Sequence, residues 1–119
     1  MTTAAPASSS RDLPHPEPTE IRLEAVLHAL SDPMRLLVVR ELAADGDELS
    51  CSHFDLPVTK STTTHHFRVL REAGVIRQVY RGTAKMSGLR RDDLDDLFPG
   101  LFDSVLAAAA RQAVRLGGS

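Results

Sequence analysis

The segment that most constrains the fold of this chain runs from Thr59 to Gly74, where the signals of a single amphipathic helix follow one another in order. Thr59 is a suitable N-cap, because its hydroxyl can accept a hydrogen bond from an amide of the first turn. Thr63, Phe67 and Leu70 recur at helical spacing and predict the side that packs on the core. Gly74 stands where a helix commonly ends in a left-handed residue. The pattern therefore predicts one helix with one buried side.

The other side of this helix, expected over residues 60–73, carries short hydroxyl groups near its start and long cations toward its end. The major groove of DNA admits one α-helix, whose N-terminal residues reach the base edges. Small donors allow close approach there, and arginines can reach the phosphates on either side. The pattern favours a DNA-recognition helix over an ordinary solvated face. The residues expected to face DNA are Lys60, Ser61, Thr62, Thr64, His65, Arg68 and Arg71.

The charge of the chain is unevenly distributed. The whole sequence has 14 Lys and Arg and 16 Asp and Glu, a formal net charge of -2. Residues 60–91 hold eight of the cations and a single acid, Glu72, for a net +7, which leaves six cations and fifteen acids, or -9, elsewhere. Such asymmetry is typical of a polyanion-binding surface. Charge alone supports a merely solvated basic surface equally well.

Helical patterns precede the basic segment. An apolar stripe at i, i+3, i+4 and i+7 predicts a first helix from Leu23, Val26, Leu27 and Leu30. Asp32-Pro33 predicts the start of a second helix, because Asp caps free amides and Pro fits the first turn. We expect this helix to end at Asp45-Gly46-Asp47, and a short helical segment to follow over Ser50–Phe54.

The helical period is lost after Gly74. Ile76–Tyr80 and Lys85–Leu89 predict two short strands around Arg81-Gly82-Thr83, a hairpin with a basic tip. We expect Arg77, Arg81 and Lys85 to contact the flanking minor groove or phosphates. A charged helix over Arg91–Leu97 and an apolar helical pattern after Pro99 follow. The predicted fold is mainly α with a small β-hairpin, a winged helix-turn-helix.

Composition sets the domain organisation and excludes several classes of protein. Residues 1–18 are rich in Ala, Ser and Pro and predict a disordered tail, followed by one domain over 19–116 and a flexible end at 117–119. With no Trp, four Phe and one Tyr, a stacking surface for single strands is disfavoured. The longest apolar run, Val105–Ala110, is far shorter than the ~18–20 residues of a membrane span. Since no secretory pattern opens the chain, we expect a cytoplasmic protein.

Two motifs resemble those of the ArsR/SmtB family of transcription regulators. Residues 29–36, ALSDPMRL, are similar to the opening of the second helix in that family, ALSDPTRL. Residues 58–76, VTKSTTTHHFRVLREAGVI, are similar to the family's recognition helix, VSKSTxSHHFxVLREAGLI. The likeness covers roughly residues 20–106 and implies a winged helix in each subunit of a homodimer. It also implies that Ser61, Thr62, Thr64 and His65 face DNA, whereas His66 packs against a neighbouring helix.

In this family the first and last helices form the dimer interface. Apolar stripes on both helices of this chain fit that role, although the core of a monomer would use them equally well. The residues that the resemblance places at the interface are Leu23, Val26, Leu27, Leu30, Leu101, Phe102, Val105, Leu106 and Ala109.

Many family members release DNA when they bind a metal, so each metal site of the family must be compared. The cysteine motif ELCVCDL is matched only in part by residues 48–55, ELSCSHFD, which keep Cys51 and place His53 two positions on. The site on the last helix is absent in its usual form, because Ser104–Leu106 follow Asp103 and no His follows His66. The remaining candidate ligands are Cys51, His53 and His15, with His28 and Glu17 as further donors, a set that suits Zn²⁺ or Ni²⁺.

Other interpretations of these residues remain open. A lone intracellular Cys is more often a small buried hydrophobe, and an isolated His is more often a surface or packing residue. A redox role for Cys51 is disfavoured, because its acidic neighbours Asp47, Glu48 and Asp55 oppose formation of a thiolate.

The leading hypothesis is a sequence-specific regulator that binds double-stranded DNA at an operator with two-fold symmetry. The alternative is a winged helix whose basic face docks on an acidic protein partner. An enzyme is disfavoured, because no oxyanion loop, Gly-rich phosphate cradle or paired carboxylates accompany Cys51 and His53.

Overall fold

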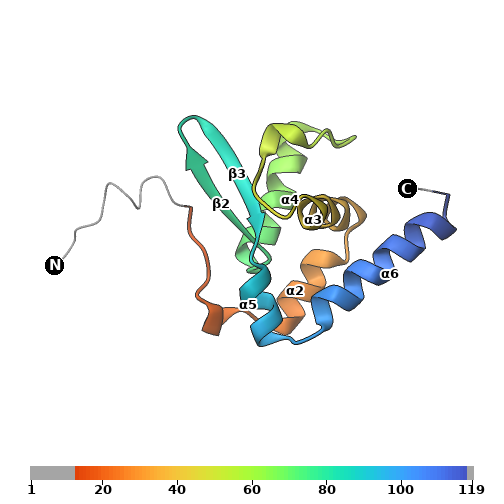
Figure 1. The fold of residues 1–119 in the computed structure, drawn as a ribbon. Helices are drawn as coiled ribbons and strands as arrows, with labels where there is room; N and C mark the ends of the chain where they lie inside the picture. Colours follow the sequence, from red (N-terminus) through yellow and green to blue (C-terminus); the bar gives the residue numbers. More distant parts are fainter. Residues whose placement is uncertain (1–12, 118–119) are drawn as a thin grey trace.

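The computed structural model describes residues 13–117 and places a small sheet beside a set of helices (Figure 1). The predicted order of helices around a hairpin is confirmed. The elements in chain order are η1 (Pro18–Glu20), α2 (Leu23–Leu30), α3 (Pro33–Asp45), β1 (Leu49–Ser50), η2 (Cys51–His53), α4 (Lys60–Glu72), β2 (Ile76–Arg81), β3 (Ala84–Leu89), α5 (Arg91–Leu97) and α6 (Leu101–Arg115).

The helices α3 and α4 begin where the sequence signals predict. The carboxylate of Asp32 accepts hydrogen bonds from the amides of Met34 and Arg35, at 2.8 and 3.2 Å, before α3. Partial burial raises the pKa of Asp32, but these two bonds together with the nearby charges of His66 and Arg35 outweigh it, so the pKa lies below its ordinary value. The hydroxyl of Thr59 caps α4 by accepting from the amide of Thr62 at 3.2 Å. Local hydrogen bonding therefore sets both helix starts.

Gly74 ends α4 in a conformation that only glycine adopts easily. Its φ is +86°, and a Cβ at this position would lie 2.6 Å from Cγ1 of Ile21. The missing side chain thus serves two purposes, because it permits the left-handed turn and lets Ile21 pack against the backbone. The turn directs the chain from α4 into β2.

The sheet has three antiparallel strands in the order β1-β3-β2. The predicted hairpin is confirmed, with Gln78 opposite Ser87 and Arg81 opposite Ala84. The strand β1 was not expected from the sequence: its two residues pair with Ser87 and Met86. Two residues are too few to show a strand alternation, so only the tertiary pairing defines β1.

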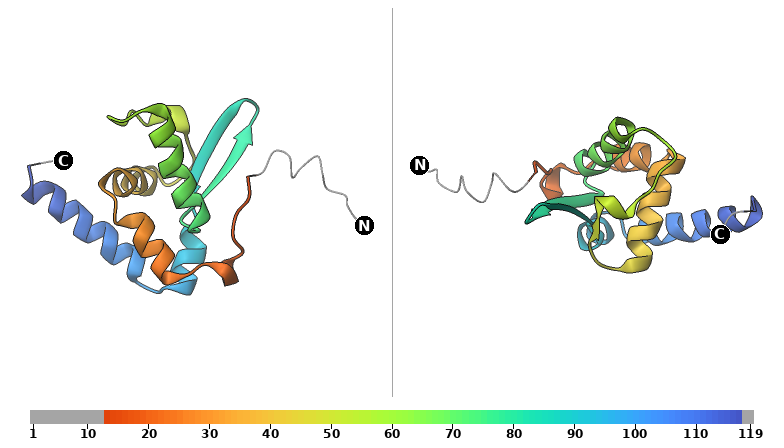
Figure 2. Two further views of the ribbon diagram at one scale, coloured as in Figure 1. Left: turned by 180° about the vertical axis from the view of Figure 1, so that it is seen from behind. Right: turned by 90° about the horizontal axis from the view of Figure 1, so that it is seen from above.

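Apolar side chains from the five helices α2 to α6, and from the ends of the hairpin, form the core. Its fully buried members include Val26, Val38, Leu70, Ile76 and Phe102. Figure 2 shows that the hairpin β2–β3 stands beside α4, whereas α6 extends on the other side of the molecule. The basic helix and the basic hairpin therefore lie together at one end of the domain.

The part of the expected N-terminal tail that the structure describes lies against the sheet. The backbone amide of Gln78 in β2 donates to Nε2 of His15 at 3.0 Å. Nη1 of Arg90 donates to the carbonyl oxygen of Pro16 at 2.8 Å. Residues 1–12 of the expected tail and residues 118–119 of the expected flexible end lie outside the described residues.

No helix within residues 13–117 is both long enough and apolar enough to cross a membrane.

Candidate functional site

The helix α4 presents a polar, cationic face to solvent. Five of the residues expected to face DNA are exposed and Thr62 is half-buried, while Phe67 and Leu70 on the opposite side are buried in the core. Nη2 of Arg68 donates to Nδ1 of His65 at 3.3 Å, which holds these two side chains together on the exposed face. The exposed residues are Lys60, Ser61, Thr64, His65 and Arg68.

His66 lies on the inner side of α4, as the family resemblance implied. Its Nδ1 lies 3.1 Å from Nη1 of Arg35 in α3. Because a guanidinium can only donate, Nδ1 must accept, and a neutral ring would then carry its proton on Nε2. Arg35 also donates through Nε to the carbonyl oxygen of Ala29 at 2.7 Å. Through Arg35, these buried contacts join α4 to α3 and to the end of α2.

The sequence prediction that Arg71 lies on the DNA-facing side of α4 is wrong. The side chain of Arg71 is only 8% exposed, and Nη1 donates to Oε1 of Gln78 at 2.7 Å. The reason is the helical period, because position 71 is four residues after buried Phe67 and lies on the same side of α4. Its Nε has no hydrogen-bond partner among the described residues. Arg71 therefore joins α4 to β2.

The hairpin carries its cations near the same end of the molecule. Arg77 and Arg81 are exposed and Lys85 is half-buried. Arg81 is held by Glu48, to which its Nε and Nη2 donate at 2.8 Å each. Nζ of Lys85 lies 6.0 Å from the centre of the Tyr80 ring, a cation–π distance. Lys85 thus adds positive charge beside the start of α4. Arg77 and Arg81 lie on the opposite face of β2 from Gln78, which bonds to α4, and both are on the side of Glu48.

The candidate metal ligands each have other partners. Sγ of Cys51 lies 3.7 Å from Oγ of Ser87, and Nε2 of His53 lies 3.1 Å from Oε1 of Glu41. Nε2 of His15 is occupied as the acceptor of the Gln78 amide. Burial first, and then the cations Arg77, Arg90 and Arg71, lower the pKa of His15. No group of three or more His, Cys, Asp or Glu side chains suited to a metal ion occurs within residues 13–117.

The residues expected at a dimer interface fall into three sets according to their exposure. Leu23 and Leu27 of α2 are exposed, by 43% and 45%. By contrast, Val26, Leu30, Phe102 and Ala109 are buried within the protomer itself. The other three, Leu101, Val105 and Leu106, are half-buried.

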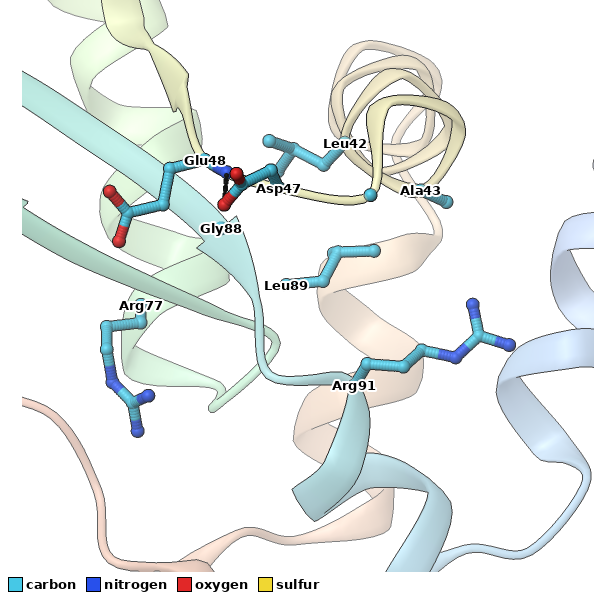
Figure 3. Close-up of a pocket in the computed structure, with 9 residues that line it drawn as sticks. Leu42, Ala43, Asp47, Glu48, Arg77, Gly88, Leu89 and Arg91 are labelled. Carbon is cyan, nitrogen blue, oxygen red and sulfur yellow. Dashed lines mark hydrogen bonds between the residues drawn. The ribbon is translucent and has the colours of Figure 1, made fainter.

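One cavity, of about 250 Å³, lies between the end of α3, the start of β1 and β3 (Figure 3). Glu48, Arg77 and Arg91 line it, and the figure shows Arg91 extended away from the sheet. Arg91 pairs with Asp95 and Asp103, and Glu48 pairs with Arg81. Because Arg91 and Glu48 already have opposite charges as partners, these two side chains offer little to a charged ligand.

A larger cavity, of about 410 Å³, lies beneath the start of α4. The segment after η2 provides Phe54 and Leu56, α4 provides Lys60 and Phe67, and the sheet provides Gln78 and Lys85. These residues are far apart in the sequence and no short motif contains them, so sequence reasoning missed this cavity.

Comparison with known proteins places the chain among regulators. It matches no protein-family model. It is 34% identical over 82 residues to YceK of Bacillus subtilis, an uncharacterized HTH-type transcriptional regulator, covering 67% of this chain and 82% of that protein. An uncharacterized HTH-type transcriptional regulator of Methanocaldococcus jannaschii is 32% identical over 59 residues, which cover 49% of this chain and 66% of the relative.

Solved structures confirm the winged helix-turn-helix. An ArsR family transcriptional regulator aligns with a TM-score of 0.56 at 20% identity, covering 82% of this chain and 98% of the other. The transcriptional repressor BigR from Xylella fastidiosa aligns with a TM-score of 0.51 at 22% identity, covering 64% of this chain and 85% of BigR. A possible transcriptional regulator for arsenical resistance aligns with a TM-score of 0.52 at 27% identity, covering 77% of this chain and 98% of the other. The predicted resemblance to the ArsR/SmtB family is confirmed in the fold.

Proposed function

The chain belongs to the HTH-type transcriptional regulators and has the fold of ArsR family regulators, and from this premise we propose how it binds double-stranded DNA. The helix α4 enters the major groove, and the hairpin β2–β3 contacts the flanking backbone or minor groove. The observation that carries the proposal is the exposed face of α4, where Ser61, Thr64, His65 and Arg68 stand opposite a buried apolar side. We propose no catalytic activity.

The side chains of this face have different roles in the proposal. Ser61 and Thr64 carry short hydroxyl groups and His65 an imidazole near the start of α4, and these three side chains read base edges. Phosphates are contacted from α4 by Lys60, with Thr62 beside it, and by Arg68. The hairpin adds phosphate contacts from Arg77, Arg81 and Lys85. Such contacts contribute affinity but carry no sequence information. Arg71 is left out, because Gln78 holds it inside the domain.

We further propose that two copies of the domain over 19–116 bind together, at an operator with two-fold symmetry. Leu23 and Leu27 on α2 are exposed apolar side chains, as are Val114 and Leu116 at the end of α6, which are 73% and 74% exposed. Burying such surface in a second copy is favourable at roughly 25 cal/mol per Å². Sedimentation of the full chain and of Leu27→Glu tests this step: the wild type should sediment as a dimer and the variant as a monomer. A monomeric wild type would contradict it.

The DNA proposal is tested by selection from a random duplex library, followed by titration of the selected duplex at several salt concentrations. The affinity should fall by about 0.9 log units per log unit of salt for each neutralised phosphate. Thr64→Ala or His65→Ala should change the preferred sequence, at ~1–3 kcal/mol per lost base contact. Arg68→Ala should instead weaken selected and random duplexes alike.

Two outcomes would contradict the proposal. A salt slope near zero would mean that phosphates are not neutralised at the interface. Tight binding to an acidic protein with no affinity for any duplex would favour the alternative role, a protein-interaction module.

A response to Zn²⁺ or Ni²⁺ through Cys51, His53 and His15 stays a prediction. Repeating the duplex titration with each metal, on the wild type and on Cys51→Ser, tests it. A metal-dependent change in affinity that Cys51→Ser abolishes would support it, and identical affinities with and without metal would contradict it.

A further inference from the structure

The cavity beneath the start of α4 has the size and the walls of a small-molecule site. Its volume of about 410 Å³ lies within the range of roughly 300–1,000 Å³ that is usual for ligand pockets. Phe54 and Phe67 form one wall, with their ring centres 5.3 Å apart and their planes inclined by 61°. Leu56 and Val58 extend the apolar lining toward the solvent. An apolar, flat ligand body would fit against these side chains.

The polar groups deep in this cavity have partners within the protein. The side chain of Gln78 is fully buried, accepts from Arg71 and donates to Oγ of Ser87 at 3.1 Å. Its Nε2 also donates to Sγ of Cys51 at 3.7 Å. Because these groups already have partners, the charged residues of the lining must provide any strong attraction for a ligand.

The charged residues of the cavity are Lys60, Lys85 and Asp55. They leave a net positive charge, and neither lysine forms an ion pair with a carboxylate among residues 13–117. Lys60 comes from α4 and Lys85 from β3, so the two cations approach the cavity from two different elements. An anionic group that lies between them pairs with both cations, while an apolar body lies against the phenylalanines.

We propose that this cavity binds a small aromatic carboxylate and that its occupancy weakens DNA binding. The carboxylate pairs with Lys60 and Lys85, and the ring lies against Phe54 and Phe67. The effect on DNA rests on the proposed function, in which both lysines contact phosphates. A ligand that neutralises them competes with the duplex, and by linkage the duplex weakens ligand binding to the same degree.

The ligand site is tested with 2-naphthoate as the probe, by fluorescence titration of the full chain. The chain contains no Trp, so protein emission does not obscure the probe. We expect saturable binding of one probe per chain, and weaker binding of the neutral analogue 2-naphthalenemethanol. Lys85→Gln should weaken naphthoate binding about threefold, the order of a half-exposed ion pair. Arg111→Gln, which removes an exposed cation of α6, is the matched control and should leave naphthoate binding unchanged.

Cys51 provides a second readout that locates the probe. It lines the cavity and is the only cysteine of the chain, so alkylation by iodoacetamide reports on this site alone. Saturating naphthoate should slow the alkylation, and the neutral alcohol at the same concentration should slow it less. Unsaturable binding, equal binding of acid and alcohol, or an unchanged alkylation rate would each overturn the site.

A duplex titration with and without naphthoate tests the regulatory effect separately. At saturating probe the duplex affinity should fall at least about fivefold, a usual size for coupled sites. An unchanged duplex affinity beside confirmed probe binding would overturn the regulatory effect and leave the site standing. If the chain bound no duplex at all, the proposed function would fail, whereas the fluorescence and alkylation results would still decide the site.

Discussion

Arg81 and Glu48 form a bidentate ion pair that joins the tip of the hairpin to the start of β1. Nε of Arg81 donates to Oε1 of Glu48 and Nη2 donates to Oε2, both at 2.8 Å. These hydrogen bonds lower the pKa of Glu48 below its ordinary value, against the smaller opposing effect of burial. A cation proposed to contact DNA is thus already bound to a carboxylate of its own chain.

Replacing Glu48 by Gln should raise the affinity for a duplex. A phosphate would no longer compete with a carboxylate for Arg81, and we expect a gain of about two- to fivefold, the order of one exposed ion pair. The measurement is duplex titration at fixed salt. Glu41→Gln makes the same change of net charge on α3, where Glu41 contacts His53. An equal gain in both variants would show that net charge, and not the Arg81 contact, is responsible.

Two arginines of α4, three residues apart, should differ in what they do. Arg68→Ala removes an exposed cation, so the salt slope of duplex binding should become shallower while the free energy of unfolding changes little. Arg71→Ala leaves the buried Oε1 of Gln78 without its donor, which should lower the free energy of unfolding by about 1–3 kcal/mol. Urea unfolding and salt-dependent titration of both variants separate these effects. Equal stability of the two variants would contradict the structural role of Arg71.

The contact between His15 and Gln78 should make stability depend on pH. The amide of Gln78 needs an unprotonated Nε2 as acceptor, and burial and three nearby arginines lower the pKa of His15 from its ordinary 6.5. The neutral ring is therefore favoured in the folded state. Its stabilisation is complete above pH 6.5, and it is lost as the pH falls through the lowered folded-state pKa.

Urea unfolding over a range of pH tests this dependence. His15→Gln keeps an acceptor but cannot titrate, so its free energy of unfolding should fall less than that of the wild type below pH 6.5. The matched variant His28→Gln, at an exposed position of α2, should behave as the wild type. The same pH dependence in all three proteins would rule out His15 as its source.

Gly74→Ala should destabilise the domain strongly. The left-handed conformation at φ +86° costs an L-residue roughly 1–2 kcal/mol. The new Cβ would also lie 2.6 Å from Ile21, which must then move. We expect a loss of about 2 kcal/mol or more in the free energy of unfolding, measured by urea denaturation. Gly46→Ala is the control, since it shares a positive φ, +81°, but a Cβ there meets nothing within 4 Å. An equal loss of unfolding free energy in both variants would show that the backbone conformation alone causes it.

The helices and the exposed face of α4 could be predicted because their causes are local. Asp32 and Thr59 bond to amides two or three residues away, and Gly74 ends α4 within the same turn. Such hydrogen bonds depend on a few neighbouring residues, so a sequence pattern is sufficient to indicate them. The family motif lies in the same local segment, over residues 58–76, and it predicted the fold together with the inner position of His66.

Contacts between distant segments decided the rest. The sequence shows that Arg71, Glu48 and His15 are polar, but it does not show that they bond to Gln78, Arg81 and the amide of Gln78 respectively. His15 and Gln78 are 63 residues apart, and Glu48 and Arg81 are 33 apart. The partner of a long polar side chain depends on which elements pack together. The residues next to it in the chain do not indicate that packing. The bond between Arg71 and Gln78, the pairing of β1 and the cavity beneath α4 are therefore properties of the tertiary structure.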